Sequence, residues 1–213
     1  MAALTLIEII TLYVAIKNYR RHPRLRIFVA YTLFSMLQIW TPYFCGLDVN
    51  KVISNKIFGA VTNTFMIFEF TVCIFFILQH LTSRARRRAV IIDAVIYVLF
   101  LLWAMVRHPE SVFAPVFFFF ESFFLLVPCL LYIYDLFVNP PPGKLRDYPS
   151  FWVVTGFLVL NGCSVPLLLA VELLRRFAQN MYSINFILYM GLFLLLMRAY
   201  RCAPLKRADD ASA

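Results

Sequence analysis

The chain has 213 residues, of which 62% are hydrophobic and 15% are charged, with a formal net charge of +9 at pH 7. A soluble domain carries about 25% charged residues, so this composition excludes an ordinary soluble protein. Seven apolar segments, each near the roughly 20 residues of a bilayer crossing, fill most of the chain. They predict an all-α polytopic integral membrane protein, with one seven-helix domain over residues 1–200 and a short tail at 201–213. The predicted spans are 2–17, 27–45, 59–80, 89–106, 116–138, 151–174 and 182–200.

The basic residues predict the orientation of the chain in the membrane. Short loops rich in Lys and Arg stay cytoplasmic, which places the N-terminus outside and the C-terminus, with its tail, in the cytoplasm. The positive charge is therefore attributed to topology and to attraction for anionic lipids, and no nucleic-acid partner is expected. We expect a multi-pass protein of the cell membrane, of the bacterial inner-membrane type, with the lipid bilayer as its first partner. Fifteen of the 20 Lys and Arg residues lie on the predicted cytoplasmic side, in 17–26, 84–88, 144–146 and 198–207.

The second and sixth segments share a sequence pattern at identical spacing. Thr32–Gln38 aligns with Thr155–Asn161, so that Thr, Phe and Leu match and Gln stands opposite Asn. Internal repeats are common in transporter folds. The alignment indicates two parallel three-helix repeats, helices 1–3 and 5–7, around a linker helix; chance matching of apolar segments is the alternative.

This 3 + 1 + 3 arrangement resembles the SWEET and PQ-loop transporters of sugars and amino acids, in the architecture of the whole chain. The Pro-Gln dipeptide of that family is absent, since neither Pro42 nor Pro166 is followed by Gln. The sugar transporters of the family use Asn residues on the third and seventh helices. The resemblance therefore implies a ligand-binding role for Asn63 and Asn185, which lie near the outer ends of those helices. The chain is also similar to small seven-helix bacterial membrane proteins of unassigned function.

Three carboxyl groups at membrane depth are the strongest functional candidates. Glu69 lies at the middle of the third segment, Glu121 in the outer half of the fifth and Glu8 midway along the first. A charge at this depth costs roughly 2.5–3.5 kcal/mol on insertion scales, and no Lys or Arg lies at comparable depth. These acids must be protonated, satisfied by polar neighbours or neutralised by a bound cation. We interpret them as proton- or ligand-binding groups; the alternative is that each is a protonated acid in a structural hydrogen bond.

Two prolines predict helix kinks within the membrane. Pro removes its own N–H and clashes with the carbonyl four residues earlier, so Pro166 would free a carbonyl near Asn161, and Pro128 would do the same in the fifth segment. Broken helices often line transporter sites, although Pro also simply bends membrane helices. If the bundle closes in the usual way, a polar site is predicted from Glu69, Glu121, Asn161, Asn63 and Asn185.

The remaining acids are predicted to be structural. Asp93 follows a run of arginines at a helix N-terminus, where an anion is favoured. Asp135 lies close to the cytoplasmic interface. Glu172 has Arg175 and Arg176 three and four residues later, a spacing that allows surface ion pairs on a helix.

No motif in the chain indicates an enzyme, a metal site or a cofactor. The seventh segment has no Lys for a retinal Schiff base, and the five cysteines show no metal-ligand spacing. Ser-His-Asp sets, HExxH and phosphate-binding Gly-rich loops are also missing. We predict a non-enzymatic, transporter-like protein that binds a small solute, a proton or a cation in a polar core. The alternatives are a membrane sensor or receptor coupled to a separate cytoplasmic partner, or an accessory subunit of a membrane complex.

Overall fold

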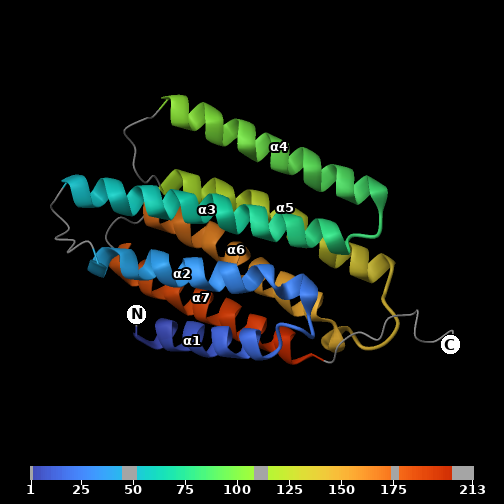
Figure 1. Ribbon diagram of the computed structural model, residues 1–213. Coiled ribbons are helices and arrows are strands. Elements are labelled where there is room, and N and C mark those ends of the chain that lie inside the picture. The colour runs from blue at the N-terminus through green and yellow to red at the C-terminus, as the bar shows by residue number, and fades with distance from the viewer. Residues whose placement is uncertain (1, 45–51, 108–114, 174–177, 203–213) are drawn as a thin grey trace.

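The helices of the protein lie side by side in one bundle, with the start of the first helix at one end and the end of the last helix at the other (Figure 1). The computed structural model describes residues 2–44, 52–107, 115–173 and 178–202, and within these residues it contains helices and no strand. The predicted all-α bundle of seven helices is thus confirmed. The α-helices are α1 (Ala2–Lys17), α2 (Ile27–Phe44), α3 (Val52–His80), α4 (Arg84–Arg107), α5 (Pro115–Val138), α6 (Pro149–Leu173) and α7 (Ala178–Arg201), and the short 3-10 turns are η1 (Pro23–Leu25) and η2 (Leu145–Asp147).

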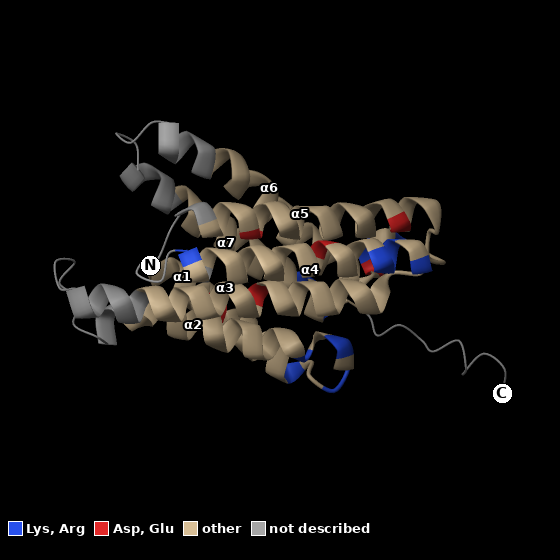
Figure 2. Ribbon diagram, turned by 90° about the horizontal axis from the view of Figure 1, so that it is seen from above, with Lys and Arg blue, Asp and Glu red and all other residues tan. Residues whose placement is uncertain are grey.

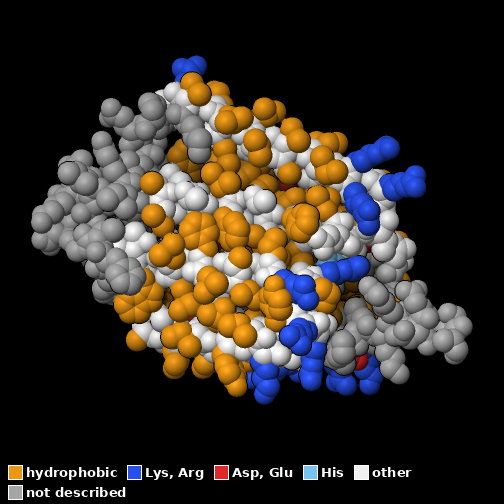
Figure 3. Space-filling model, in the orientation of Figure 1, with side chains coloured by type: hydrophobic (Ala, Val, Ile, Leu, Met, Phe, Trp, Pro, Cys, Tyr) orange, Lys and Arg blue, Asp and Glu red, His pale blue; other side chains and the backbone are white. Residues whose placement is uncertain are grey.

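In the part of the chain that the structure describes, four helices are long and apolar enough to cross a membrane. At a rise of about 1.5 Å per residue, spans of this length cover about 27–33 Å, close to the thickness of the bilayer core. The surface has the matching character, because Figure 3 shows hydrophobic side chains along much of the face that it draws and most Lys and Arg near one end. The four stretches are Gly59–His80 in α3, Phe117–Val138 in α5, Pro149–Leu167 in α6 and Ile184–Arg201 in α7.

Six helices form a closed ring, and α4 lies outside it. Each of α1, α2, α3, α5, α6 and α7 packs against the next in that order, and α7 returns to α1. Helix α4 packs on α5 and, less closely, on α3, at the edge of the bundle (Figure 1). Its outer face is apolar, with Ile92, Leu99 and Val106 all exposed. In a bilayer this face would contact lipid.

The helices extend beyond several of the apolar segments that predicted them. Helix α3 begins at Val52 and α4 at Arg84, both earlier than the hydropathy indicates. Apolar character marks the part of a helix that needs a lipid environment, whereas backbone hydrogen bonding continues into the polar ends. Helices α5 and α6 run without a break through Pro128 and Pro166. The described backbone therefore has no unwound segment at either proline.

The end of the bundle that carries most of the arginines is held by polar contacts between loops and helices. Asp135 of α5 accepts hydrogen bonds from the Thr82 backbone N–H at 2.7 Å and from Asn139 Nδ2 at 2.8 Å, and it pairs with Arg86. This network joins the α3–α4 turn to α5, in agreement with the structural role predicted for Asp135. Asp93 keeps one buried oxygen without a partner in the described part of the chain.

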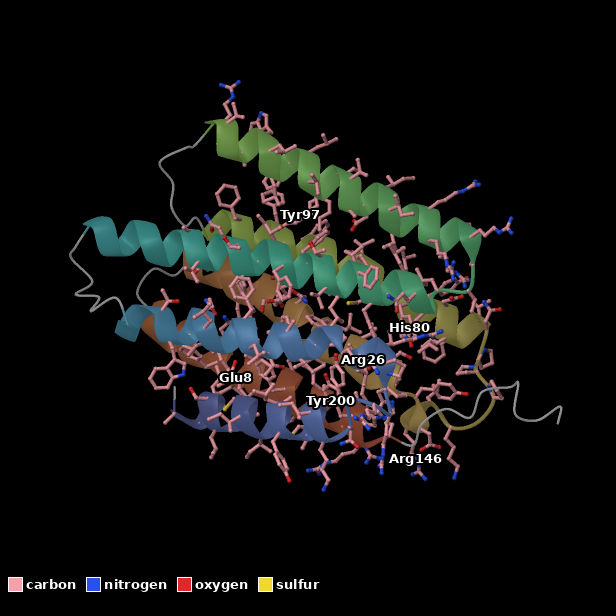
Figure 4. All side chains as sticks on the ribbon, viewed as in Figure 1. Glu8, Arg26, His80, Tyr97, Arg146 and Tyr200 are labelled. Atoms are coloured by element: carbon pink, nitrogen blue, oxygen red, sulfur yellow. The ribbon has the colours of Figure 1, made fainter. Side chains whose placement is uncertain are left out.

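A second set of contacts joins α1 and α2 to the end of α7, and Figure 4 marks Tyr200 in this region. His22 Nε2 donates to the carbonyl of Cys202 at 3.1 Å, and the Tyr200 hydroxyl donates to the carbonyl of Leu25 at 2.8 Å. Burial lowers the pKa of His22, against the opposing effect of its hydrogen bond to Cys202. The pairing of Glu172 with Arg175 and Arg176 lies outside the side chains that the structure describes.

Candidate functional site

Besides Asp135, which pairs with Arg86, three described carboxyl groups are buried among the helices of the ring. Glu8 of α1, Glu69 of α3 and Glu121 of α5 are 0%, 3% and 2% exposed. Figure 2 shows some acidic residues along the middle of the helices and others beside the basic residues at one end. Among the described residues, the ion pairs are Arg86–Asp135 and Arg146–Asp147, so these three acids have no basic partner there. Burying an isolated charge is costly. Each carboxyl must therefore be neutral, hydrogen-bonded or compensated by a bound cation.

Glu69 is the centre of a cluster drawn from four helices of the ring. It accepts a hydrogen bond from the Tyr189 hydroxyl of α7, at 3.2 Å. The hydroxyl of Tyr31, on α2, faces the same carboxyl but has no partner within normal hydrogen-bond geometry. Glu121 lies close enough for its charge to interact with that of Glu69. Helices α2, α3, α5 and α7 thus each contribute one polar group.

Helix α4 contributes Tyr97 to the cluster, although it lies outside the ring. The Tyr97 side chain is 1% exposed, and Figure 4 places it between α4 and the neighbouring α3 and α5. Its ring packs on Phe70 and Phe124, with centroids 4.1 Å and 5.5 Å apart. Its hydroxyl interacts electrostatically with both Glu121 and Glu69 and lacks a hydrogen-bond partner in the described residues.

Glu8 forms a second polar pair where α1 meets α2. One of its oxygens accepts a hydrogen bond from Ser35 Oγ at 2.6 Å, and its other oxygen has no partner in the described chain. The Tyr31 hydroxyl interacts electrostatically with Glu8 as well as with Glu69 and Glu121. Tyr31 therefore connects the Glu8–Ser35 pair with the cluster around Glu69 and Glu121, and the two form one polar region.

Buried polar atoms without hydrogen-bond partners are concentrated in and around this region. Native proteins leave few such atoms, and most buried polar groups bond to protein or to ordered water. Their concentration here indicates a place that can take up water, a proton or a ligand. In the described residues these atoms belong to Glu8, Tyr31, Thr62, Asp93, Tyr97, Glu121, Ser122 and Asn185.

The three predicted asparagines differ in their positions. Asn185 lies one turn before Tyr189 on α7 and has an unpartnered Oδ1. Asn161 is 3% exposed, but its amide donates to the Phe157 carbonyl of its own helix at 2.9 Å. Asn63 is partly exposed and lies about 120° around α3 from Glu69, as the helix period of 3.6 residues requires. Of the three, Asn185 fits the Glu69 site best.

Several members of the cluster were not among the predicted site residues, namely Tyr31, Tyr97, Tyr189, Ser35 and Thr62. Thr62 had a detectable signal, because it lies seven residues before Glu69 and therefore on the same helix face. The tyrosines had none, since the chain contains 11 of them and membrane interfaces are rich in Tyr. Identifying the tyrosines of the site requires the rotation of each helix.

Comparison with known proteins gives no match to a family model, a curated protein or a solved structure. The class of the protein therefore rests on its own fold and site, which define a helical bundle with four candidate membrane spans and a buried acid–tyrosine cluster. Within the described residues, no group of three or more His, Cys, Asp or Glu residues could hold a metal ion.

Proposed function

We propose that the protein is a transporter-like membrane protein whose polar core binds a proton or a small cation at Glu69 and Glu121, with Glu8 as an additional acidic group. The observation that supports this most is the burial of all three carboxyls in one bundle without a basic partner among the described residues. A proton or a cation neutralises such a group without placing a second protein charge in the membrane. The surrounding hydroxyl groups offer oxygen atoms for the same purpose.

We also propose that all seven helices cross the membrane. Helix α2 contains no charged residue, and α4 contains only Asp93 between Arg88 and Arg107. Helix α1 is shorter, at 16 residues or about 24 Å. Most of the described Lys and Arg residues lie at the end of the bundle where α7 ends (Figure 2). By the positive-inside rule, this end is cytoplasmic and the N-terminus is outside, in a multi-pass protein of the bacterial inner-membrane type.

The packing order supports a parallel 3 + 1 + 3 repeat. In such a repeat, α1, α2 and α3 correspond to α5, α6 and α7. Each pair of neighbouring helices in the ring then corresponds to another pair that is also in contact; the pair α3–α5, for example, corresponds to α7–α1. Glu8 and Glu121 then occupy the first helix of each half. This symmetry and the peripheral position of α4 favour the transporter-like architecture of the SWEET and PQ-loop type.

The proposal is tested by following protonated carboxyl groups with infrared spectroscopy. Purified protein in liposomes should show the carbonyl stretching band of a buried protonated carboxyl, because ionising that group would bury a charge. We expect the band to weaken as the pH rises from about 5 to about 9, and to lose part of its intensity in Glu69→Gln and in Glu121→Gln.

The control is Asp147→Asn, which removes an acid that is 59% exposed in its side chain. It should leave the band and its titration unchanged. A band that does not respond to pH, with the same intensity in wild type and in both Gln variants, would contradict the proposal. The acids would then be structural hydrogen-bonding groups.

A further inference from the structure

The buried interior of the bundle changes character along its length. We call the part from Glu69 toward the first residues of α1, α3, α5 and α7 the outer half, and the part from Glu69 toward the arginine-rich end the inner half. The outer half, with Glu69 at its border, holds most of the unpartnered polar atoms. Buried polar side chains of the outer half include Thr5, Glu8, Ser35, Thr62, Glu121 and Ser164.

The inner half contains four buried aromatic side chains from four helices, which we call the aromatic seal: Phe28 of α2, Phe76 of α3, Phe157 of α6 and Phe193 of α7. All four are at most 2% exposed. The ring centroid of Phe28 lies 5.0 Å from that of Phe76 and 6.0 Å from that of Phe157. Aromatic rings at these separations pack closely against one another.

Tyr31 marks the boundary between the site and the aromatic seal. Its ring packs on Phe157 and Phe193, with centroids 5.8 Å and 6.1 Å apart. Its hydroxyl instead faces the Glu69 carboxyl. A single side chain therefore belongs to the seal through its ring and to the polar site through its hydroxyl.

The faces of α3 and α7 show the same change from polar to aromatic. On α3, residues spaced by seven lie on one face, and this face reads Thr62, Glu69 and Phe76 toward the inner end.

On α7, residues spaced by four share a face, and this face reads Asn185, Tyr189 and Phe193. Unpartnered oxygens of Thr62 and Asn185 thus precede the site on both helices, and a ring of the seal follows it. On these two faces, unpartnered polar atoms therefore lie on the outer side of the site and aromatic rings on its inner side.

We infer that the Glu69 site exchanges protons or cations with the outer end of the bundle, and that the aromatic seal closes it toward the arginine-rich end. The charge distribution also favours the entry of cations from the outer end, because the arginines repel cations at the inner end and the carboxyls attract them from the outer end. This inference rests on the proposed function. In the proposed orientation, the site is loaded from outside the cytoplasm.

The test is thiol labelling from each side of sealed, oriented vesicles with a membrane-impermeant maleimide. The background replaces Cys45, Cys163 and Cys202 by Ser and retains Cys73 and Cys129, which lie in the inner half and are 1% and 0% exposed. These two native thiols serve as internal controls.

Thr62→Cys or Asn185→Cys is then added to this background. We expect either introduced thiol to react from the outer side about tenfold or more faster than the two native thiols, because labelling requires an accessible thiolate. The native thiols should stay unmodified from both sides. Thr and Cys are similar in size, and the melting temperature of each variant confirms that it is folded.

Absence of labelling of both introduced thiols from the outer side would overturn the inference, as would rapid labelling of Cys73 or Cys129 from the arginine-rich side. The outcome is separate from that of the infrared titration. Outer labelling without a titrating carboxyl band would support the route and contradict the bound proton or cation. A titrating band without outer labelling would support the site and contradict the route.

Discussion

The outer and inner halves of the bundle differ in how their buried side chains are satisfied. In the inner half, rings such as Phe28 and Phe76 pack against each other at 5.0 Å. In the outer half, Ser35 bonds to Glu8, whereas Ser122 is equally buried and has no partner in the described chain. The close aromatic packing therefore lies in the inner half, and most of the unpartnered polar atoms of the described residues lie in the outer half.

In a lipid bilayer, close packing in the inner half would matter more for stability than it does in water. Lipid removes most of the hydrophobic driving force between helices, so close packing and hydrogen bonds must hold the bundle together. Close packing is visible at Gly156, in the inner part of α6, where a Cβ atom would lie 2.7 Å from Leu192 Cδ1 of α7. Unpartnered polar atoms lower the stability that a buried side chain contributes, because they lose their hydrogen bonds to water without replacement.

The largest effect is expected from removing the central ring of the aromatic seal. Phe28→Ala should lower the free energy of unfolding by about 3–5 kcal/mol, because it leaves a cavity where the side chain is 0% exposed. Denaturant unfolding in detergent micelles measures the change. Phe75→Ala, at a side chain that is 53% exposed, is the matched control and should change stability by less than about 0.5 kcal/mol. Equal effects of the two substitutions would show that the aromatic seal contributes no more to stability than an exposed ring of the same half.

A smaller effect is expected from the polar network at the inner end. Asp135→Asn keeps the size of the side chain but removes the charge that pairs with Arg86 and one acceptor of the Thr82 and Asn139 hydrogen bonds. We expect a loss of about 1–3 kcal/mol in the same unfolding assay. Asp147→Asn is the control, because its exposed pair with Arg146 at 3.9 Å should contribute less than about 1 kcal/mol. If Asp135→Asn is neutral, the network does not hold α4 to the bundle.

Hydropathy was sufficient to predict the helices and the buried acids. Glu69 and Glu121 stand out because a carboxyl within a long apolar segment is rare. The tyrosines of the site could not be predicted, since their role depends on which way each helix faces. The position of α4 outside the ring depends on packing between distant segments. Asn161 was predicted to line the polar site, but its amide donates a hydrogen bond to the carbonyl of Phe157 in its own helix. Such a local hydrogen bond competes with contacts across the bundle.

The smallest changes in the free energy of unfolding are expected from substituting two buried serines of the outer half, and the two changes should differ. Ser35→Ala removes the hydroxyl that donates to Glu8 at 2.6 Å, and leaving a buried carboxyl unpartnered should cost about 1–2 kcal/mol. Ser122→Ala removes a hydroxyl that has no partner in the described residues, and should be neutral or stabilising by up to about 1 kcal/mol. Both side chains are 1% exposed, so burial alone would make the two substitutions equal. A cost at Ser122 as large as that at Ser35 would show that Ser122 bonds to a tightly held water or ligand, and the outer half would then be a satisfied polar core.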